Sequence, residues 1–112
     1  MVARTWTSLA LFCQRCGKLE LHDLSRFSLS HERRQLYCHC GQWQGEILAT
    51  SHSQPLLRLP CLLCQQDHLL CFTPHQFWQA ERHRLYCPNH TLELGLIGRP
   101  DLLREQQLRH RQ

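Results

Sequence analysis

The residues best suited to chemistry are the eight cysteines, most of which stand in close pairs. Cys13 and Cys16 form one CxxC pair, and Cys61 and Cys64 form another. Two cysteines separated by two residues can reach one metal ion from a single tight turn. A second turn of the same kind can then supply the other two ligands of a tetrahedral site. The pairs therefore predict metal binding, with one site in each half of the chain.

The first predicted site takes its four ligands from two cysteine pairs that are far apart along the chain. After Cys13 and Cys16, the second pair is the CxC motif of Cys38 and Cys40. A glycine directly follows each pair, and glycine tolerates the positive φ that a sharp metal-binding turn requires. We expect a site of four thiolates here.

The second predicted site has three clear cysteines and an open choice for the fourth ligand. Cys61, Cys64 and Cys87 correspond to the first three cysteines of the first site, but Asn89 stands where Cys40 would be expected. The neighbouring His90 completes a CxxH motif, and it is the ligand that we favour. Two alternatives lie just beyond the CxxC pair and could fold back to the ion: His68 and Cys71.

The similarity between the two sites extends to an internal repeat. Cys13 and Cys61 lie 48 residues apart, and the two Leu-Tyr-Cys segments that end at Cys38 and Cys87 lie 49 residues apart. His22 and His68 also occupy roughly matching places. Two unrelated motifs would rarely keep such constant separations, so the pattern indicates a duplication.

The repeat predicts two units joined by a polar, proline-containing linker. The expected divisions are a first unit at 1–49, a linker at 50–55, a second unit at 56–98 and a tail at 99–112. Alternating leucines favour short strands in both units. Thr73 and Pro74 favour the start of one short helix in the second unit. In the tail, Pro100 fits a helix start, but its few leucines predict only a marginal amphipathic helix.

These motifs resemble the zinc-ribbon and zinc-knuckle group of small proteins, here in tandem. The resemblance rests on the cysteine pairs with their glycines and on the CxxC and CxxH motifs of the second unit. It implies a small, β-rich fold held by Zn²⁺, with two ions per chain and one site in each unit. Proteins of this structural class commonly bind nucleic acid or other proteins.

Size and compartment support a metal. The chain has 112 residues, and two units of about 50 residues each approach the lower limit of what a hydrophobic core can stabilise alone. The apolar stretch before Cys13 is too short for a signal peptide, and no apolar run approaches the roughly 20 residues that cross a bilayer. We therefore expect a cytoplasmic protein with no membrane partner, in which reduced cysteines bind metal.

The partner is predicted only as a class. The formal net charge is +4, and twelve of the thirteen basic residues are arginines, which suit contacts with phosphate. Nucleic acid would be bound by arginines that alternate with aromatic residues, namely Arg26, Arg33, Arg34, Arg82 and Arg84. A protein partner is equally compatible with the tryptophans Trp6, Trp43 and Trp78.

No motif of a catalytic zinc site, a nucleophile elbow or a phosphate-binding loop is present, so we expect an adaptor or regulator and no enzyme. The alternative function is a thiol-based redox sensor or a metal-handling protein. In that case the Cys13–Cys16 pair would form a reversible disulfide.

Overall fold

The computed structural model describes residues 6–25, 33–49, 55–61 and 63–110, and these form a small β-rich fold with two antiparallel sheets and two helices. The predicted β-rich class is therefore confirmed at this level. The linker expected at 50–55 lies outside the described residues except for Pro55, which begins a strand. The strands of the first half of the chain are β1 (Trp6–Phe12), β2 (Leu19–Ser25), β3 (Arg34–Tyr37) and β4 (Trp43–Ala49). The elements of the second half are β5 (Pro55–Cys61), β6 (Gln66–Cys71), α2 (Pro74–Gln79), β7 (Arg82–Tyr86), β8 (Glu93–Gly98) and α3 (Pro100–His110).

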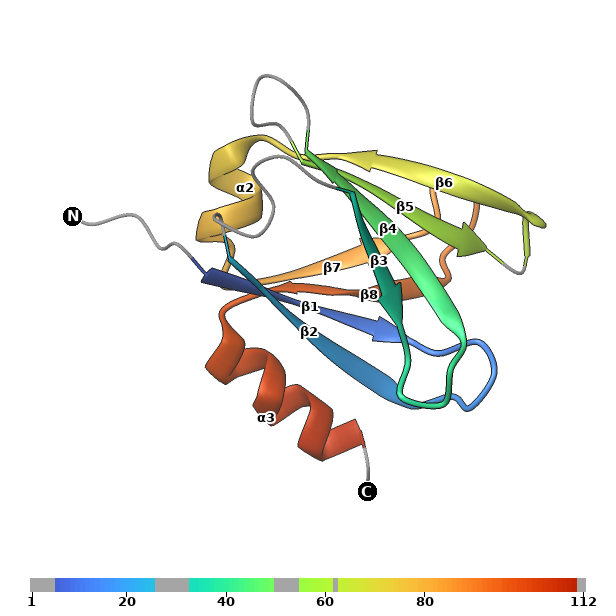
Figure 1. Ribbon diagram of the computed structural model, residues 1–112, viewed down its shortest axis with the longest axis horizontal. Coiled ribbons are helices and arrows are strands. Elements are labelled where there is room, and N and C mark those ends of the chain that lie inside the picture. The colour runs from blue at the N-terminus through green and yellow to red at the C-terminus, as the bar shows by residue number, and fades with distance from the viewer. Residues whose placement is uncertain (1–5, 26–32, 50–54, 62, 111–112) are drawn as a thin grey trace.

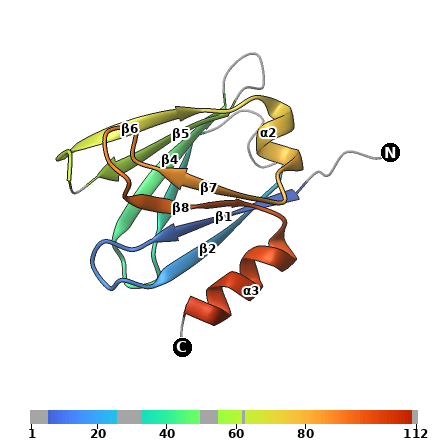
Figure 2. The ribbon, with the colours of Figure 1, turned by 180° about the vertical axis from the view of Figure 1, so that it is seen from behind.

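The two halves of the chain exchange hairpins between the sheets, as Figures 1 and 2 show. One sheet, here sheet A, has the strand order β2-β1-β8-β7, and the other, sheet B, has the order β3-β4-β5-β6. Each sheet thus combines two strands from the first half with two from the second. If β1 to β4 are matched in order with β5 to β8, sheet A maps onto sheet B, so the repeat appears in the topology as an approximate two-fold relationship.

The central pairings of both sheets join strands from different halves. β1 pairs with β8, with Leu9 opposite Ile97, and β4 pairs with β5, with Ile47 opposite Leu57. These four residues are fully buried in one hydrophobic core to which both sheets contribute. The halves therefore share their interior, and neither half of the described chain has a sheet of its own.

Two glycines at equivalent positions allow the close approach of these central strands. A Cβ atom on Gly45 would lie 2.6 Å from the carbonyl oxygen of Arg58, and one on Gly95 would lie 2.2 Å from that of Ala10. Both distances are shorter than any normal contact of a Cβ atom. Glycine is therefore required in β4 and β8 for the pairing that joins the two halves.

The helix predicted in the second half is present as α2, and its start is confirmed. Thr73 accepts a hydrogen bond from the backbone N–H of Gln76, and the Gln76 side chain accepts one from the backbone N–H of Thr73. This reciprocal capping box satisfies two N–H groups that would otherwise lack partners. The helix directs Phe77 and Trp78 into the shared core, where their rings pack edge to face with centroids 4.9 Å apart.

The C-terminal helix α3 is better anchored than the marginal tail helix expected from the sequence. It lies on the outer face of sheet A, beside β1, β2 and β8 (Figure 1). Leu103 is fully buried there with Ala10, Leu19 and Leu96. Gln107 donates a hydrogen bond to the carbonyl oxygen of Leu19. Tertiary contacts thus supply the stability that a short amphipathic helix lacks by itself.

Candidate metal centres

The four cysteines predicted for the first site come together between the ends of two hairpins. Cys13 and Cys16 lie in the turn from β1 to β2, and Cys38 and Cys40 lie in the turn from β3 to β4. Their sulfur atoms all lie within 4.8 Å of one another. The pairs Cys13–Cys40 and Cys16–Cys38 each have a separation of 3.6 Å between sulfurs. That is far longer than the roughly 2.05 Å of a disulfide bond, and the cysteines are free thiols.

The turns that carry these cysteines have the expected sharp form. Gly17 donates a backbone hydrogen bond to the carbonyl of Cys13, and Gly41 donates one to the carbonyl of Cys38. Both glycines have positive φ, 76° and 95°, as their place after each pair predicted. The backbone N–H groups of Arg15 and Cys16 point to the Cys13 sulfur at 3.4 Å.

These N–H groups shift the acidity of the first group. Burial raises the pKa of the Cys13 thiol, but the backbone hydrogen bonds from Cys16 and Arg15 and the neighbouring thiols lower it, to a net value of about 6. The pKa of Cys38 is raised to about 12, chiefly by burial and also by contacts with the other thiols. One thiolate is therefore favoured near neutral pH even without a cation, and a cation is needed to draw all four into the charged form.

The second group contains three of the predicted cysteines and a histidine. Cys61 and Cys64 lie between β5 and β6, Cys87 follows β7, and His68 projects from β6. The four ligand atoms lie within 4.8 Å of one another. The Cys64 and Cys87 sulfurs are 3.5 Å apart, and Nε2 of His68 lies 3.2 Å from the Cys87 sulfur. This set could hold a second metal ion.

His68 thus takes the place in this group that the sequence analysis favoured for His90. His90 lies outside the group; its backbone N–H closes the turn by donating to the carbonyl of Cys87, the role that Gly41 has in the first half. The other alternative, Cys71, is exposed at the end of β6 and is also outside the group. His68 is 7 % exposed, because its strand position turns it toward the core.

Strand register gives the physical reason for this choice. Leu11 in β1 pairs with Glu20 in β2, and Leu59 in β5 pairs with His68 in β6. Glu20 and His68 are therefore the matching residues, 48 residues apart like the CxxC pairs. The rough match of His22 with His68 expected from the sequence is two residues out of register. Counting from the CxxC pairs would have identified His68 as a residue beside the site.

The side chain of Asn89 completes the surroundings of the second group. It occupies the turn position that Cys40 holds in the first half, and its Nδ2 donates a hydrogen bond to the Cys64 sulfur at 3.5 Å. An amide donor at this position stabilises a thiolate without replacing it as a ligand. The two groups therefore take their fourth donor from different elements, a turn in the first and a strand in the second.

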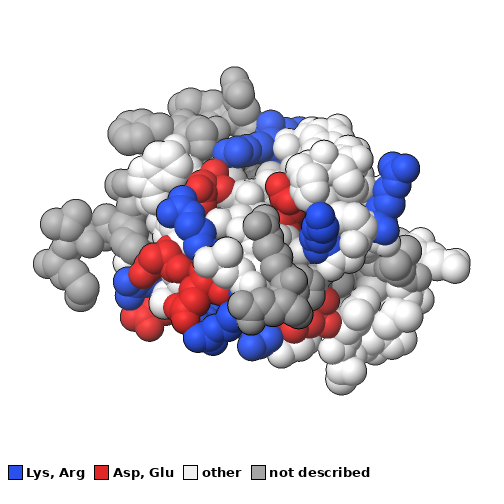
Figure 3. Space-filling model, turned by 90° about the horizontal axis from the view of Figure 1, so that it is seen from below, with Lys and Arg blue, Asp and Glu red and all other residues white. Residues whose placement is uncertain are grey.

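Most arginines predicted to bind nucleic acid are already engaged with groups of the protein itself. Arg33 lies 3.6 Å from the buried carboxylate of Glu46, and Arg84 lies 2.8 Å from the carboxylate of Glu93. Arg34 donates to the backbone carbonyl of Asp23. Arg82 is exposed on β7, and Arg26 lies outside the described residues. Figure 3 shows basic and acidic side chains intermixed on the face it presents, and no broad patch of one sign.

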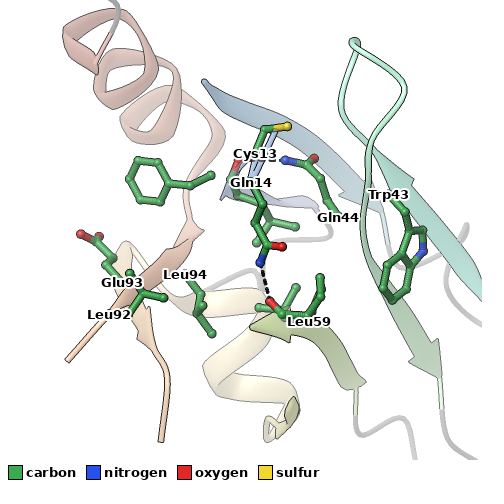
Figure 4. A pocket seen from close by; sticks show the side chains of 11 residues that line it. Cys13, Gln14, Trp43, Gln44, Leu59, Leu92, Glu93 and Leu94 are labelled. Atoms are coloured by element: carbon green, nitrogen blue, oxygen red, sulfur yellow. Dashed lines mark hydrogen bonds between the residues drawn. The ribbon is translucent and has the colours of Figure 1, made fainter. Parts of the chain in front are cut away.

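A pocket of about 130 Å³ lies beside the first group, and residues of both halves line it. Its walls are mainly apolar, and Figure 4 shows Trp43 and Leu94 on opposite sides. Gln14, next to Cys13, donates a hydrogen bond to the carbonyl of Pro60 at 2.8 Å and so connects β1 with β5. Leu92 is 38 % exposed at the pocket.

Comparison with known proteins identifies no relative. No protein-family model, no curated protein and no solved structure matches this chain. None of the helices in the described residues is long and apolar enough to cross a membrane.

Proposed function

We propose that this protein is a non-catalytic binding module stabilised by two zinc ions. The observation that carries the proposal is the presence of two groups of four metal-ligating side chains at equivalent places in an internal repeat. The first ion is bound by Cys13, Cys16, Cys38 and Cys40, and the second by Cys61, Cys64, Cys87 and His68.

The spacing of the sulfurs supports zinc. Four sulfurs at Zn–S distances of about 2.3 Å in a tetrahedron lie about 3.8 Å from one another. The described separations of 3.6, 3.6 and 3.5 Å need little adjustment to reach that geometry. Sets of four cysteines, or of three cysteines and one histidine, are the usual ligands of structural zinc.

The ligand count supports a structural role and no catalysis. A catalytic zinc ion keeps one coordination position for water or substrate, whereas each group here supplies four protein ligands. The zinc ions would instead tie together the hairpin ends, where the chain has few apolar contacts to hold its turns.

Among partners, we favour a protein. The pairing of Arg33, Arg34 and Arg84 within the molecule leaves fewer basic groups for phosphate. The small apolar pocket with Leu92 and Trp43 at its walls has about the size of one inserted side chain, which is how an anchor residue is bound at many protein interfaces.

Metal analysis tests the zinc proposal. Protein purified without added metal should contain two zinc ions per chain, and removal by a strong chelator should abolish its ordered structure as followed by circular dichroism and NMR. Cys71→Ser should retain both ions, because Cys71 lies outside both groups. A native, well-ordered protein that contains no metal, or one whose paired cysteines form disulfides, would refute the proposal.

Two further measurements separate the alternatives. Zinc that survives mild hydrogen peroxide supports a structural role, whereas reversible release of zinc with disulfide formation would support the redox-sensor alternative. Fluorescence anisotropy with single-stranded and duplex oligonucleotides tests nucleic acid as the partner. We expect no binding at low salt; tight binding that weakens steeply as salt rises would overturn the preference for a protein partner.

A further inference from the structure

The first metal group has a fifth potential ligand, Glu20. We propose that Glu20 is a reserve ligand: its carboxylate completes the first site when the thiolate of Cys40 is not available. This inference rests on the proposed binding of zinc by the two cysteine groups, and it goes beyond it by assigning a metal-binding role to a residue outside both sets of four.

The internal repeat carries the first step of the argument. Glu20 and His68 occupy the same position in β2 and β6, each opposite the equivalent leucine of the neighbouring strand. His68 brings its ring nitrogen into the second group from that position. A side chain at position 20 is therefore held by the same backbone arrangement that brings a ligand to the second site.

The contacts of Glu20 carry the second step. Its Oε2 lies 3.9 Å from the sulfur of Cys38, which is one of the four ligands of the first group. The same oxygen lies 3.0 Å from Nδ1 of His39. Glu20, Cys38 and His39 have ligand atoms within 4.8 Å of one another and form a set that overlaps the first group at Cys38. A small movement of the carboxylate away from His39 would bring it to an ion held by Cys38.

The fourth-ligand positions differ chemically between the two halves. Each half offers two such positions, one in the turn and one on the strand. In the first half these hold Cys40 and Glu20, both of which are able to bind zinc; carboxylate oxygens bind it at about 2.0–2.2 Å. In the second half they hold Asn89 and His68, and the amide of Asn89 is a donor to the Cys64 sulfur. Only the first site therefore has a reserve ligand.

The consequence is a difference in tolerance. The first site would keep its ion after loss of the Cys40 thiolate, which is more accessible than the buried thiols of Cys13 and Cys38. The second site would lose its ion after loss of His68.

The experiment compares zinc content among variants in which Cys40 is removed. Cys40→Ala should retain two zinc ions per chain, whereas Cys40→Ala combined with Glu20→Gln should retain one. Cys40→Ala combined with Glu81→Gln is the matched control, because Glu81 is exposed and lies in neither group, and it should retain two. Competition with a chromophoric chelator should show at least about a tenfold lower affinity at the first site when Glu20 is also replaced.

A further variant tests the equivalence of positions 20 and 68. Cys40→Ala combined with Glu20→His reproduces the second site's set of three cysteines and one histidine. It should bind two zinc ions, and with cobalt in place of zinc both sites should show the absorption spectrum of the same ligand set. Failure of this variant to bind the second ion, in a chain that is still folded by circular dichroism, would refute the positional argument.

The outcomes also separate this inference from the zinc proposal. Two ions in the wild-type protein but one in Cys40→Ala would overturn the reserve ligand and leave the zinc proposal intact. Two ions in the Cys40→Ala/Glu20→Gln variant would also overturn it, because water would then be the fourth ligand. A wild-type protein without zinc would refute both.

Discussion

The imidazole of His68 is buried between cysteines, and a buried histidine needs a partner for its ring nitrogens. Its Nε2 lies 3.2 Å from the Cys87 sulfur, so a cation bound between them would satisfy both groups. The exposed turn position of His90 imposes no such requirement. At the scale of single residues, burial therefore distinguishes the two histidines.

This distinction gives the first prediction. His68→Ala should lower the zinc content from two ions per chain to one, because three thiolates remain at the second site and the turn offers only Asn89. His90→Ala should keep both ions and serves as the control. Elemental analysis of the purified variants measures the difference. Loss of zinc in the His90 variant but not in the His68 variant would contradict the ligand assignment.

A second prediction concerns His22, which lies on the inner side of β2 away from the metal groups. Burial lowers its pKa below 6.5, although the hydrogen bond that it shares with Oε1 of Gln44 at 2.7 Å favours the charged form. Because the folded pKa lies below the unfolded one, this histidine binds more protons in the unfolded state. Its contribution to stability is present above about pH 6.5 and is lost as the pH falls through the lower folded pKa.

The check is a comparison of His22→Gln with the wild-type protein. Both contain the same metal ligands, so the effect of acid on metal binding is common to them. The free energy of unfolding measured with denaturant should fall less between pH 7.5 and pH 5.5 in the variant. An equal fall in both proteins would show that His22 does not titrate between the two states.

At the scale of elements, helix α3 illustrates how tertiary contacts stabilise a weak local sequence. The helix has one fully buried leucine, Leu103, while Leu108 is 60 % exposed. The side chains of Arg104 and Gln107 reach β2, through an ion pair with Asp23 and a hydrogen bond to the Leu19 carbonyl. The exposed ion pair contributes little, so burial of Leu103 accounts for most of the anchoring.

The third prediction follows from this anchoring. Leu103→Ala should lower the free energy of unfolding by about 2–5 kcal/mol, the range for removing a buried leucine side chain. Leu108→Ala should change it by less than about 0.5 kcal/mol, as is usual for exposed positions. Denaturant unfolding of both zinc-loaded variants provides the measurement. Similar effects of the two substitutions would mean that α3 is not fixed on sheet A.

At the scale of the whole molecule, the two halves depend on each other. Each sheet has a central pairing between strands of different halves, and the core draws on both. The two metal groups, by contrast, each draw all four ligands from one half of the chain. Metal binding is thus local to a half, whereas the sheets are shared.

This contrast gives the fourth prediction, which concerns the separate halves. Peptides of residues 1–52 and 53–112 should each bind zinc weakly and lack ordered sheets, because β1 lacks β8 and β4 lacks β5. When mixed with zinc they should assemble into a one-to-one complex. Analytical ultracentrifugation and the dispersion of NMR spectra measure assembly and order. A half that folds alone with zinc would contradict the dependence.

The sequence by itself determined the features that depend on local spacing. The first four-cysteine group, three of the ligands of the second, the glycine turns and the capped helix α2 all follow from residues close together in the chain. Their chemistry is local, because a CxxC turn or a helix cap needs only its immediate neighbours.

Only the tertiary structure decided the fourth donor of the second group and the pairing of the two halves. His68 and His90 are both near cysteines in sequence, and the long-range register of β5 with β6 is what turns His68 inward. Likewise, alternating leucines predict strands without naming their partners, since β1 pairs with β8 across more than 80 residues of chain. Such pairings depend on how the whole core packs, and no local pattern encodes them.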